Sequence, residues 1–138
     1  MTRIPAALRR LVYDRAKGGC EYCLIHDDDA FMPHEIDHIF AEKHGGETAE
    51  SNLCLSCAIC NRNKGSDLAS LDPETGEREF LYHPRRDAWE DHFVVQDNLI
   101  IGKTPKGRAT AQLLKFNIPE RVIEREGLIA LRRYPVGK

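Results

Sequence analysis

The fold of this chain is decided by two stretches, HEIDHI at residues 34–39 and NLCLSCAICNRNK at residues 52–64. The first stretch alternates between apolar and polar residues and predicts a short strand, and residues 53–55 predict a second strand after a glycine-containing turn. Residues 57–64 predict a short helix that ends at the following glycine and lies across the hairpin. A two-stranded hairpin is marginal alone in water, so this one needs a packed helix or a bound metal.

Four polar residues in these stretches indicate a catalytic centre. Asp37 and His38 are neighbours at the end of the first predicted strand. Asn52 opens the second strand, and Asn61 directly follows the last cysteine. One carboxylate, one imidazole and two amides indicate a metal-assisted hydrolytic site. Taken singly, each also fits a structural role as a strand-end pair, a turn residue or a helix cap, but their order between two cysteine pairs favours the hydrolytic site.

Two Cys-x-x-Cys pairs flank the hairpin, Cys20 with Cys23 and Cys57 with Cys60. Four thiolates at about 2.3 Å form a closed tetrahedral zinc site, which would clamp the first turn to the helix and contribute folding energy without doing chemistry. Two such pairs make the alternative, four small buried hydrophobic residues, the weaker hypothesis. Cys54 leaves the register ambiguous, because Cys54-x-x-Cys57 has the same spacing. We prefer Cys57 and Cys60 as ligands, since Cys54 lies within the second predicted strand.

The ordered motifs of this region resemble those of the HNH endonucleases, also called ββα-metal or His-Me finger nucleases. The resemblance covers residues 20–65, and the matching residues are DHI at 37–39, GG at 45–46, NL at 52–53, CAICN at 57–61 and Lys64. The tail looks like that of some bacterial members, with HPR at 83–85, Trp89, HF at 92–93 and GRAT at 107–110. The chain departs from many members at Asn61, where they have histidine. The asparagine form is a familiar variant that keeps an oxygen ligand.

This resemblance implies a metal-dependent endonuclease that hydrolyses DNA phosphodiester bonds. It implies that His38 is the general base, and that Asp37 and Asn61 hold one divalent ion. It also implies that Asn52 steadies the hairpin loop and orients His38. Neutral imidazole is suited to take a proton from water near neutral pH. Asp and Asn oxygens favour Mg²⁺ or Mn²⁺ as the catalytic cofactor, whereas four cysteines favour structural Zn²⁺.

Basic residues provide candidates for DNA contacts. Arg62 and Lys64, which follow Asn61, are the first candidates for contacts with phosphates. The net charge of −2 is unevenly distributed: residues 1–17, with five basic and one acidic residue, carry +4, and residues 98–138, with nine basic and three acidic, carry +6. If both ends lie on one side of the molecule, their charges form a basic face. Charges scattered over the solvated surface fit this sequence equally well. The alternative function is a non-catalytic four-cysteine zinc module that binds nucleic acid or protein.

The composition fits a single domain over residues 1–138, with a core at about 18–66 and a C-terminal extension at about 67–138. Apolar residues make up 41% and charged residues 30% of the chain, as in ordinary globular proteins. We find no signal peptide and no apolar run long enough to cross a membrane, so we expect a cytoplasmic protein with reduced cysteines. The sequence does not indicate an oligomeric state, although double-strand cutting by one active site would favour a dimer.

Outside the central hairpin, the pattern predicts further elements that make the fold class α+β. A helix at residues 5–17 precedes the core. In the extension we expect an irregular strand at 77–82, a hairpin around Asp97-Asn98, a helix at 105–116 and a final helix ending near Arg133. The predicted architecture is a zinc-clamped ββα-metal core with an N-terminal helix and a C-terminal β-hairpin plus helices.

Overall fold

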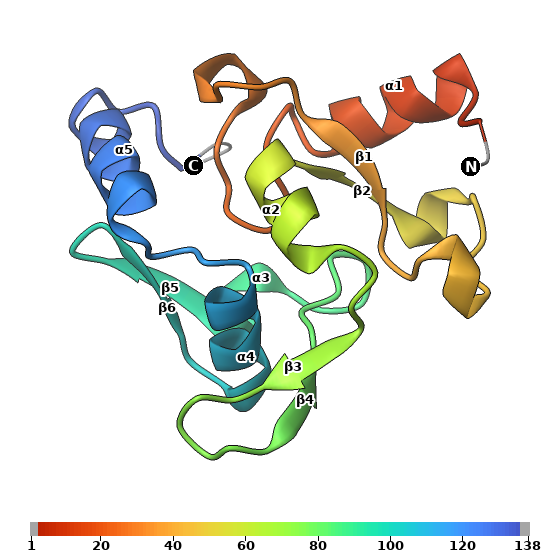
Figure 1. The fold of residues 1–138 in the computed structure, drawn as a ribbon. Helices are drawn as coiled ribbons and strands as arrows, with labels where there is room; N and C mark the ends of the chain where they lie inside the picture. The colour runs from red at the N-terminus through yellow and green to blue at the C-terminus, as the bar shows by residue number, and fades with distance from the viewer. Residues whose placement is uncertain (1–2, 136–138) are drawn as a thin grey trace.

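The computed structural model describes residues 3–135 and has a mixed α+β fold (Figure 1). Helix α1 (Ala6–Arg15) precedes an antiparallel hairpin of β1 (Glu35–His38) and β2 (Leu53–Ser56), and α2 (Ala58–Lys64) follows it. The remaining helices and strands are β3 (Ala69–Leu71), β4 (Arg78–Phe80), α3 (Trp89–His92), β5 (Phe93–Gln96), β6 (Leu99–Gly102), α4 (Pro105–Leu113) and α5 (Pro119–Ala130). Single-turn 3-10 helices lie in the connections, at Asp27–Asp29, Glu42–His44 and Glu50–Asn52. The predicted fold class is confirmed.

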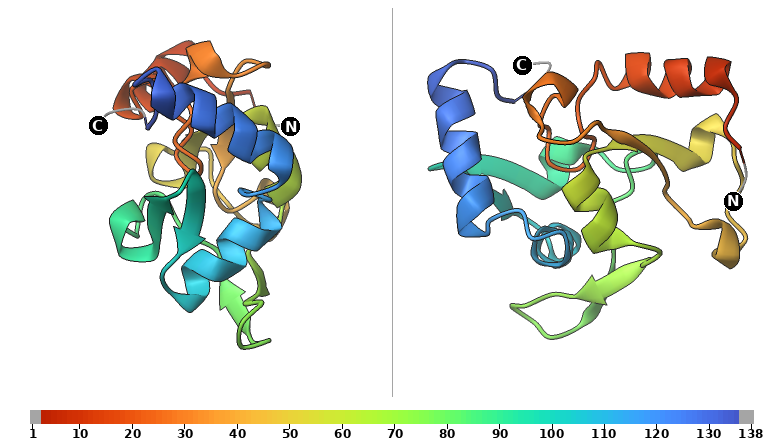
Figure 2. Two further views of the ribbon diagram at one scale, coloured as in Figure 1. Left: turned by 90° about the vertical axis from the view of Figure 1, so that its left-hand side faces the viewer. Right: turned by 45° about the horizontal axis from the view of Figure 1, so that its top comes forward.

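The β1–β2 hairpin lies between α1 and α2 (Figures 1 and 2). Its register places Asp37 opposite Cys54 and His38 opposite Leu53. Because side chains alternate along a strand, Leu53 faces α1, where it packs with Val12, and Cys54 faces the side on which α2 lies. Both faces of β2 are buried, which explains why its sequence LCLS is apolar almost throughout.

The two hairpins of the C-terminal extension pack against α4. Arg108 of α4 donates to both carboxylate oxygens of Asp72, at 3.0 and 2.8 Å, and so ties the β3–β4 hairpin to the helix. Asp97 and Asn98 have φ angles of 52° and 67° and form the predicted two-residue turn between β5 and β6. Strand β3 is not predictable from the sequence, because the three residues ASL are too few to show alternation.

Residues with positive φ end α4 and α5 earlier than the sequence pattern predicts. Thr104 begins α4 by accepting a hydrogen bond from the backbone N–H of Gly107 at 3.0 Å. The helix ends at Leu113, and Lys115 then adopts a φ of 54°. After α5, Arg132 has a φ of 60°. A left-handed residue at this position closes a helix by satisfying its last carbonyl groups.

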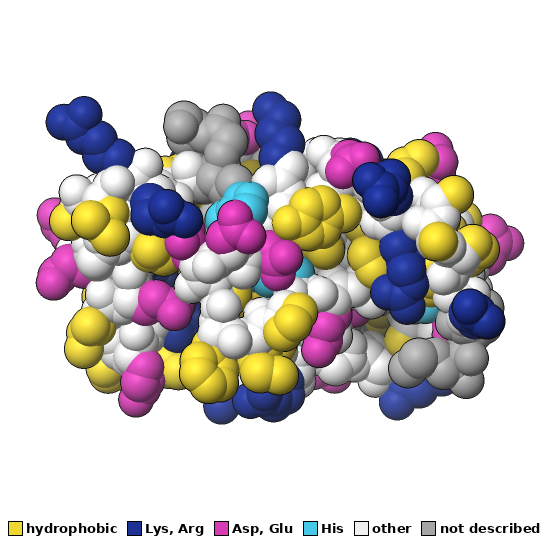
Figure 3. All heavy atoms as spheres, turned by 90° about the horizontal axis from the view of Figure 1, so that it is seen from above, with side chains coloured by type: hydrophobic (Ala, Val, Ile, Leu, Met, Phe, Trp, Pro, Cys, Tyr) yellow, Lys and Arg dark blue, Asp and Glu magenta, His cyan; other side chains and the backbone are white. Residues whose placement is uncertain are grey.

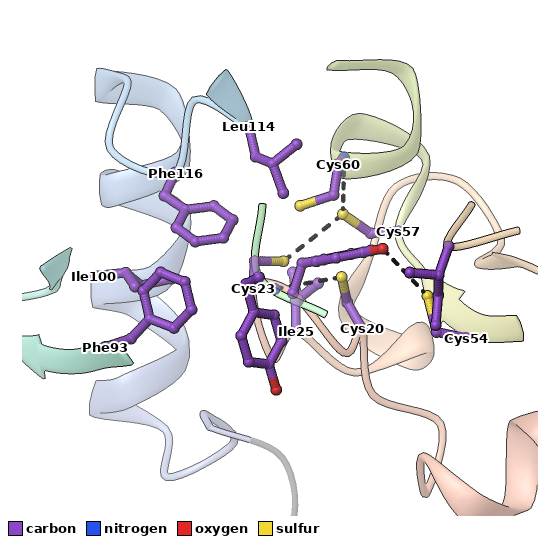
Figure 4. Packing of buried hydrophobic residues seen from close by; sticks show 13 residues of the cluster. Cys20, Cys23, Ile25, Cys54, Cys57, Cys60, Phe93, Ile100, Leu114 and Phe116 are labelled. Carbon is purple, nitrogen blue, oxygen red and sulfur yellow. Dashed lines mark hydrogen bonds between the residues drawn. The ribbon is translucent and has the colours of Figure 1, made fainter. Parts of the chain in front are cut away.

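One hydrophobic cluster joins the two parts of the chain (Figure 4). Its buried members from residues 20–60 are Cys20, Tyr22, Cys23, Ile25, Ile39, Cys54, Cys57 and Cys60, and those from the extension are Tyr82, Phe93, Ile100, Leu114 and Phe116. Trp89 is partly buried and packs against this cluster. Its indole Nε1 donates to the carbonyl oxygen of Tyr22 at 2.9 Å. The extension therefore covers the cysteines and contributes to their core.

Several basic side chains near the C-terminal end form ion pairs with acidic side chains of the same chain. Three ion pairs are Lys106 with Asp87 (3.0 Å), Arg108 with Asp72 (2.8 Å) and Arg133 with Asp29 (2.7 Å). On the face seen from above, positive, negative and apolar side chains are interspersed (Figure 3). This face fits scattered charges and not a continuous basic surface. No helix within residues 3–135 has the length and apolar character needed to cross a membrane.

Candidate functional site

The four cysteines of the two Cys-x-x-Cys pairs lie together in the core. Their Sγ atoms are all within 4.8 Å of one another, and all four residues are buried. Figure 4 shows the four sulfur atoms grouped together, with Cys54 to one side. Four thiolates bound tetrahedrally at about 2.3 Å would have sulfur atoms about 3.8 Å apart. The Sγ atoms of Cys23 and Cys57 are 3.7 Å apart, so both the donor set and its spacing fit a closed zinc site.

Cys54 belongs to a different environment. Its Sγ lies 3.5 Å from the hydroxyl oxygen of Tyr22 and 3.8 Å from Oδ2 of Asp37. Burial and the charge of Asp37 raise the pKa of the Cys54 thiol. It lies outside the group of four cysteines whose Sγ atoms are all within 4.8 Å of one another. The geometry therefore favours the zinc register with Cys57 and Cys60.

Asp37 is buried between the hairpin and α2. Its Oδ2 accepts a hydrogen bond from the Tyr22 hydroxyl at 3.0 Å and lies 3.2 Å from the ammonium of Lys64. Burial raises the pKa of Asp37, and the charge of Lys64 opposes that shift. Lys64 is only 2% exposed, and its Nζ also donates to the carbonyl oxygen of His38 at 3.3 Å. It is an internal counter-charge, a position that does not suit the phosphate contact expected from the sequence.

Side chains of α2 meet side chains of β1 at two points. The Asn61 amide donates to a carboxylate oxygen of Glu35, and Lys64, one helical turn later, reaches Asp37. Glu35 and Asp37 are two residues apart and point to the same side of β1. Asn61 and Lys64 are three residues apart and share one side of α2. Asp37 and Asn61 thus lie in the same β1–α2 contact, to which the structure adds the carboxylate of Glu35.

The side chain of His38, the last residue of β1, extends toward the connection between the two strands. Its Nε2 lies 2.9 Å from the hydroxyl of Thr48 and 3.9 Å from a carboxylate oxygen of Glu42. The His38 ring and the Asp37 carboxylate therefore have different partners, as alternation along a strand requires. Thr48 and Glu42 are not recognisable as partners of His38 from the sequence, because one threonine and one glutamate in a loop form no motif.

Asn52 stabilises the same connection through side-chain hydrogen bonds. Its Oδ1 accepts from the backbone N–H of Phe40 at 2.9 Å, and its Nδ2 donates to the carbonyl oxygens of Phe40 and Glu47 at 2.9 and 2.8 Å. At Gly46 a Cβ atom would lie 1.7 Å from the carbonyl oxygen of Phe40, so only glycine allows this close approach. These contacts fix the backbone two residues after His38, a geometry that suits the loop-holding role expected for Asn52.

The tail reaches the cysteine loop through Arg85. Its guanidinium is ion-paired with Glu21, which lies within the first Cys-x-x-Cys pair. The other oxygen of Glu21 accepts from the backbone N–H of Leu55 at 2.8 Å. Glu21 thus links the tail, the cysteine loop and β2, a role that its sequence position alone does not indicate.

Of the two residues expected to contact phosphate, only Arg62 is exposed.

Comparison with known protein families defines the class of this region. Residues 20–67 match the family described as HNH endonuclease. These residues are an HNH endonuclease domain, and their buried four-cysteine cluster is typical of the zinc site of such domains. No significant match was found among curated proteins or among solved structures.

Proposed function

We propose that this protein is a metal-dependent endonuclease that hydrolyses DNA phosphodiester bonds, with His38 as its general base. The HNH endonuclease domain at residues 20–67 supports the reaction class. The observation that carries the proposal is the placement of α2 across β1. This packing puts Asp37 and Asn61 in one contact, with His38 at the adjoining strand end.

Asp37 and Asn61 would hold the divalent ion, and their oxygen atoms suit Mg²⁺ or Mn²⁺. When bound, such an ion stabilises negative charge on the reacting phosphate and on the leaving oxygen. Lys64 competes with a cation for Asp37, because its ammonium already neutralises that carboxylate. We therefore expect modest affinity for the free ion, strengthened when a DNA phosphate is present.

His38 would accept the proton of the attacking water. The Thr48 hydroxyl at Nε2 fixes the orientation of the ring, and Asn52 holds the backbone just beyond it. A carboxylate oxygen of Glu42 lies 3.9 Å from the same ring nitrogen. Arg62, exposed on α2, is our candidate for contact with the DNA backbone.

Cys20, Cys23, Cys57 and Cys60 would hold a structural zinc ion. A site with four thiolates has no open position for substrate or water, so its contribution is to folding. Cys60 is bonded directly to Asn61. The zinc-bound cysteines would therefore fix the start of α2 and, through one peptide link, the position of Asn61.

Asn61→Ala should raise the Mg²⁺ or Mn²⁺ concentration needed for half-maximal cleavage by at least about 10-fold, because even outer partners of metal ligands change metal affinity by this much. Zinc content and melting temperature should stay near wild type. The measurement is plasmid cleavage against metal concentration. The control is Asn63→Ala, on the same helix. The amide of Asn63 donates to the carbonyl oxygen of Leu114 instead of to a residue of β1. Unchanged metal dependence in Asn61→Ala would remove Asn61 from the ion site.

One observation favours the alternative of a non-catalytic zinc module. Oδ2 of Asp37 already interacts with Tyr22 and Lys64, as in a purely structural strand-end residue. Incubation of supercoiled plasmid with Mg²⁺, with and without a chelator, separates the two functions. A folded, zinc-loaded protein that binds DNA but never cuts it would support the alternative.

We further propose that residues 1–138 fold as a single domain. Phe93, Leu114 and Phe116 of the extension share one core with the cysteines, which supports this proposal. A chain truncated after residue 67 should therefore lack a cooperative thermal unfolding transition, since it loses the apolar cover of its own core. Circular dichroism of the truncated and complete chains measures this. Equal melting temperatures would show that the extension is a separate unit.

A further inference from the structure

A buried guanidinium from outside the HNH domain lies against the cysteine cluster. Arg121, on α5, is only 5% exposed. Its Nη2 donates to Sγ of Cys60 at 3.3 Å and lies 3.8 Å from Sγ of Cys57. Its Nη1 donates to the carbonyl oxygens of Leu114 and Lys115 at 2.8 and 3.3 Å. The side chain is thus held from behind by backbone oxygens and directed at two of the four sulfur atoms.

The charge of Arg121 requires an anionic partner. A guanidinium remains protonated in proteins, and a buried charge is costly unless it is paired. Within residues 3–135, no carboxylate is ion-paired with Arg121. A zinc ion with four thiolates carries a net charge of about −2. The cysteine cluster in its metal-bound form is therefore the anion in direct contact with Arg121, and Glu124 on the same helix interacts with the guanidinium only at longer range.

We propose that Arg121 stabilises the zinc centre by donating charge-assisted hydrogen bonds to the Cys60 and Cys57 thiolates, so that zinc retention by the HNH domain depends on α5. Charge-assisted hydrogen bonds are about twice as strong as neutral ones, and outer partners that orient metal ligands change metal affinity. This inference rests on the zinc assignment and is independent of DNA cleavage.

Arg125 provides a matched control one helical turn away. It is also buried, at 4% exposure, and it lies on the same helix. Its guanidinium donates to the carbonyl oxygens of Asn98 and Phe116, both at 2.8 Å, and no hydrogen bond joins it to a cysteine among the described residues. Arg125→Met therefore removes a comparable buried cation and comparable packing but leaves the thiolate contacts intact.

The experiment compares zinc release from Arg121→Met, Arg121→Lys, Arg125→Met and the wild type. A chromogenic zinc chelator is added at a temperature at which each protein is folded by circular dichroism. We expect Arg121→Met to release zinc about 10- to 100-fold faster than wild type, in line with other outer partners of metal ligands. Arg121→Lys should be intermediate, because an ammonium keeps the charge but not the planar pair of donors. Arg125→Met should melt at a lower temperature but release zinc at the wild-type rate.

Substitution of cobalt for zinc gives a readout that packing alone does not move. The thiolate-to-cobalt charge-transfer band should shift in both Arg121 variants and stay unchanged in Arg125→Met. If Arg121→Met does not fold, the band and release rate of Arg121→Lys decide the matter. Wild-type release with an unshifted band in the Arg121 variants would overturn the proposal, as would equal acceleration in Arg125→Met. A wild-type protein that holds no zinc would also overturn it, whether or not the protein cuts DNA.

Discussion

His38→Ala is expected to slow DNA cleavage by about 10² to 10⁴, the usual contribution of a general base, while folding and DNA binding remain intact. The reason is structural as well as chemical. His38 is only partly buried, and its ring contacts Thr48 and Glu42 in the strand connection. Its loss should therefore cost little stability. Initial cleavage rates of supercoiled plasmid, with binding measured separately in the presence of Ca²⁺, test this.

His44 is the matched control for His38. It lies in the same connection, is exposed, and its Nε2 contacts only the carbonyl of Ser66 at 3.2 Å among the described residues. His44→Ala should cut DNA at close to the wild-type rate. A folded His38→Ala protein that also cuts at the wild-type rate would remove His38 from the mechanism, and another group would have to accept the proton.

Cys60→Ser should lose the bound zinc and about 3 kcal/mol or more of unfolding free energy, because a structural zinc site contributes on the order of 10 kcal/mol of binding energy that exists only in the folded chain. Elemental analysis of protein purified without added metal should find about one zinc per wild-type chain and far less in the variant. Thermal unfolding measures the loss of stability. Cleavage should fall as well, since Asn61 follows Cys60 directly.

Cys54→Ser is the internal control for the zinc register. This thiol contacts Tyr22 and Asp37 and lies outside the cluster of four, so the variant should keep one zinc. The opposite pattern, in which Cys54→Ser loses zinc and Cys60→Ser retains it, would show that the ligand register is wrong.

Features encoded by neighbouring residues were predictable from the sequence. The turn at Asp97 and Asn98 follows from the tolerance of these residue types for positive φ, and the structure has it. Each Cys-x-x-Cys pair likewise specifies its own turn, and the cluster of four needs only the hairpin to bring the pairs together. The helix ends were less predictable, since Lys115 and Arg132 adopt the left-handed region without being glycine or asparagine.

Contacts between distant segments were not predictable. Lys64 was expected to contact DNA phosphates, but the packing of α2 on β1 buries it against Asp37. Arg121 reaches Cys60 from 61 positions away in the chain. No periodicity or motif links such residues, because their proximity is set by how the extension packs on the core. The residues expected for catalysis were named from their motif, and the partners that position them appeared only in three dimensions.

The chain contains a single tryptophan, and its place in the fold gives it a practical use. The indole Nε1 of Trp89 donates a hydrogen bond to the carbonyl oxygen of Tyr22, which stands between Cys20 and Cys23 in the sequence. Any rearrangement of that cysteine loop changes the hydrogen bond and the polarity around the ring. Its fluorescence should therefore change when zinc is bound or removed, in unlabelled protein and without contributions from a second indole.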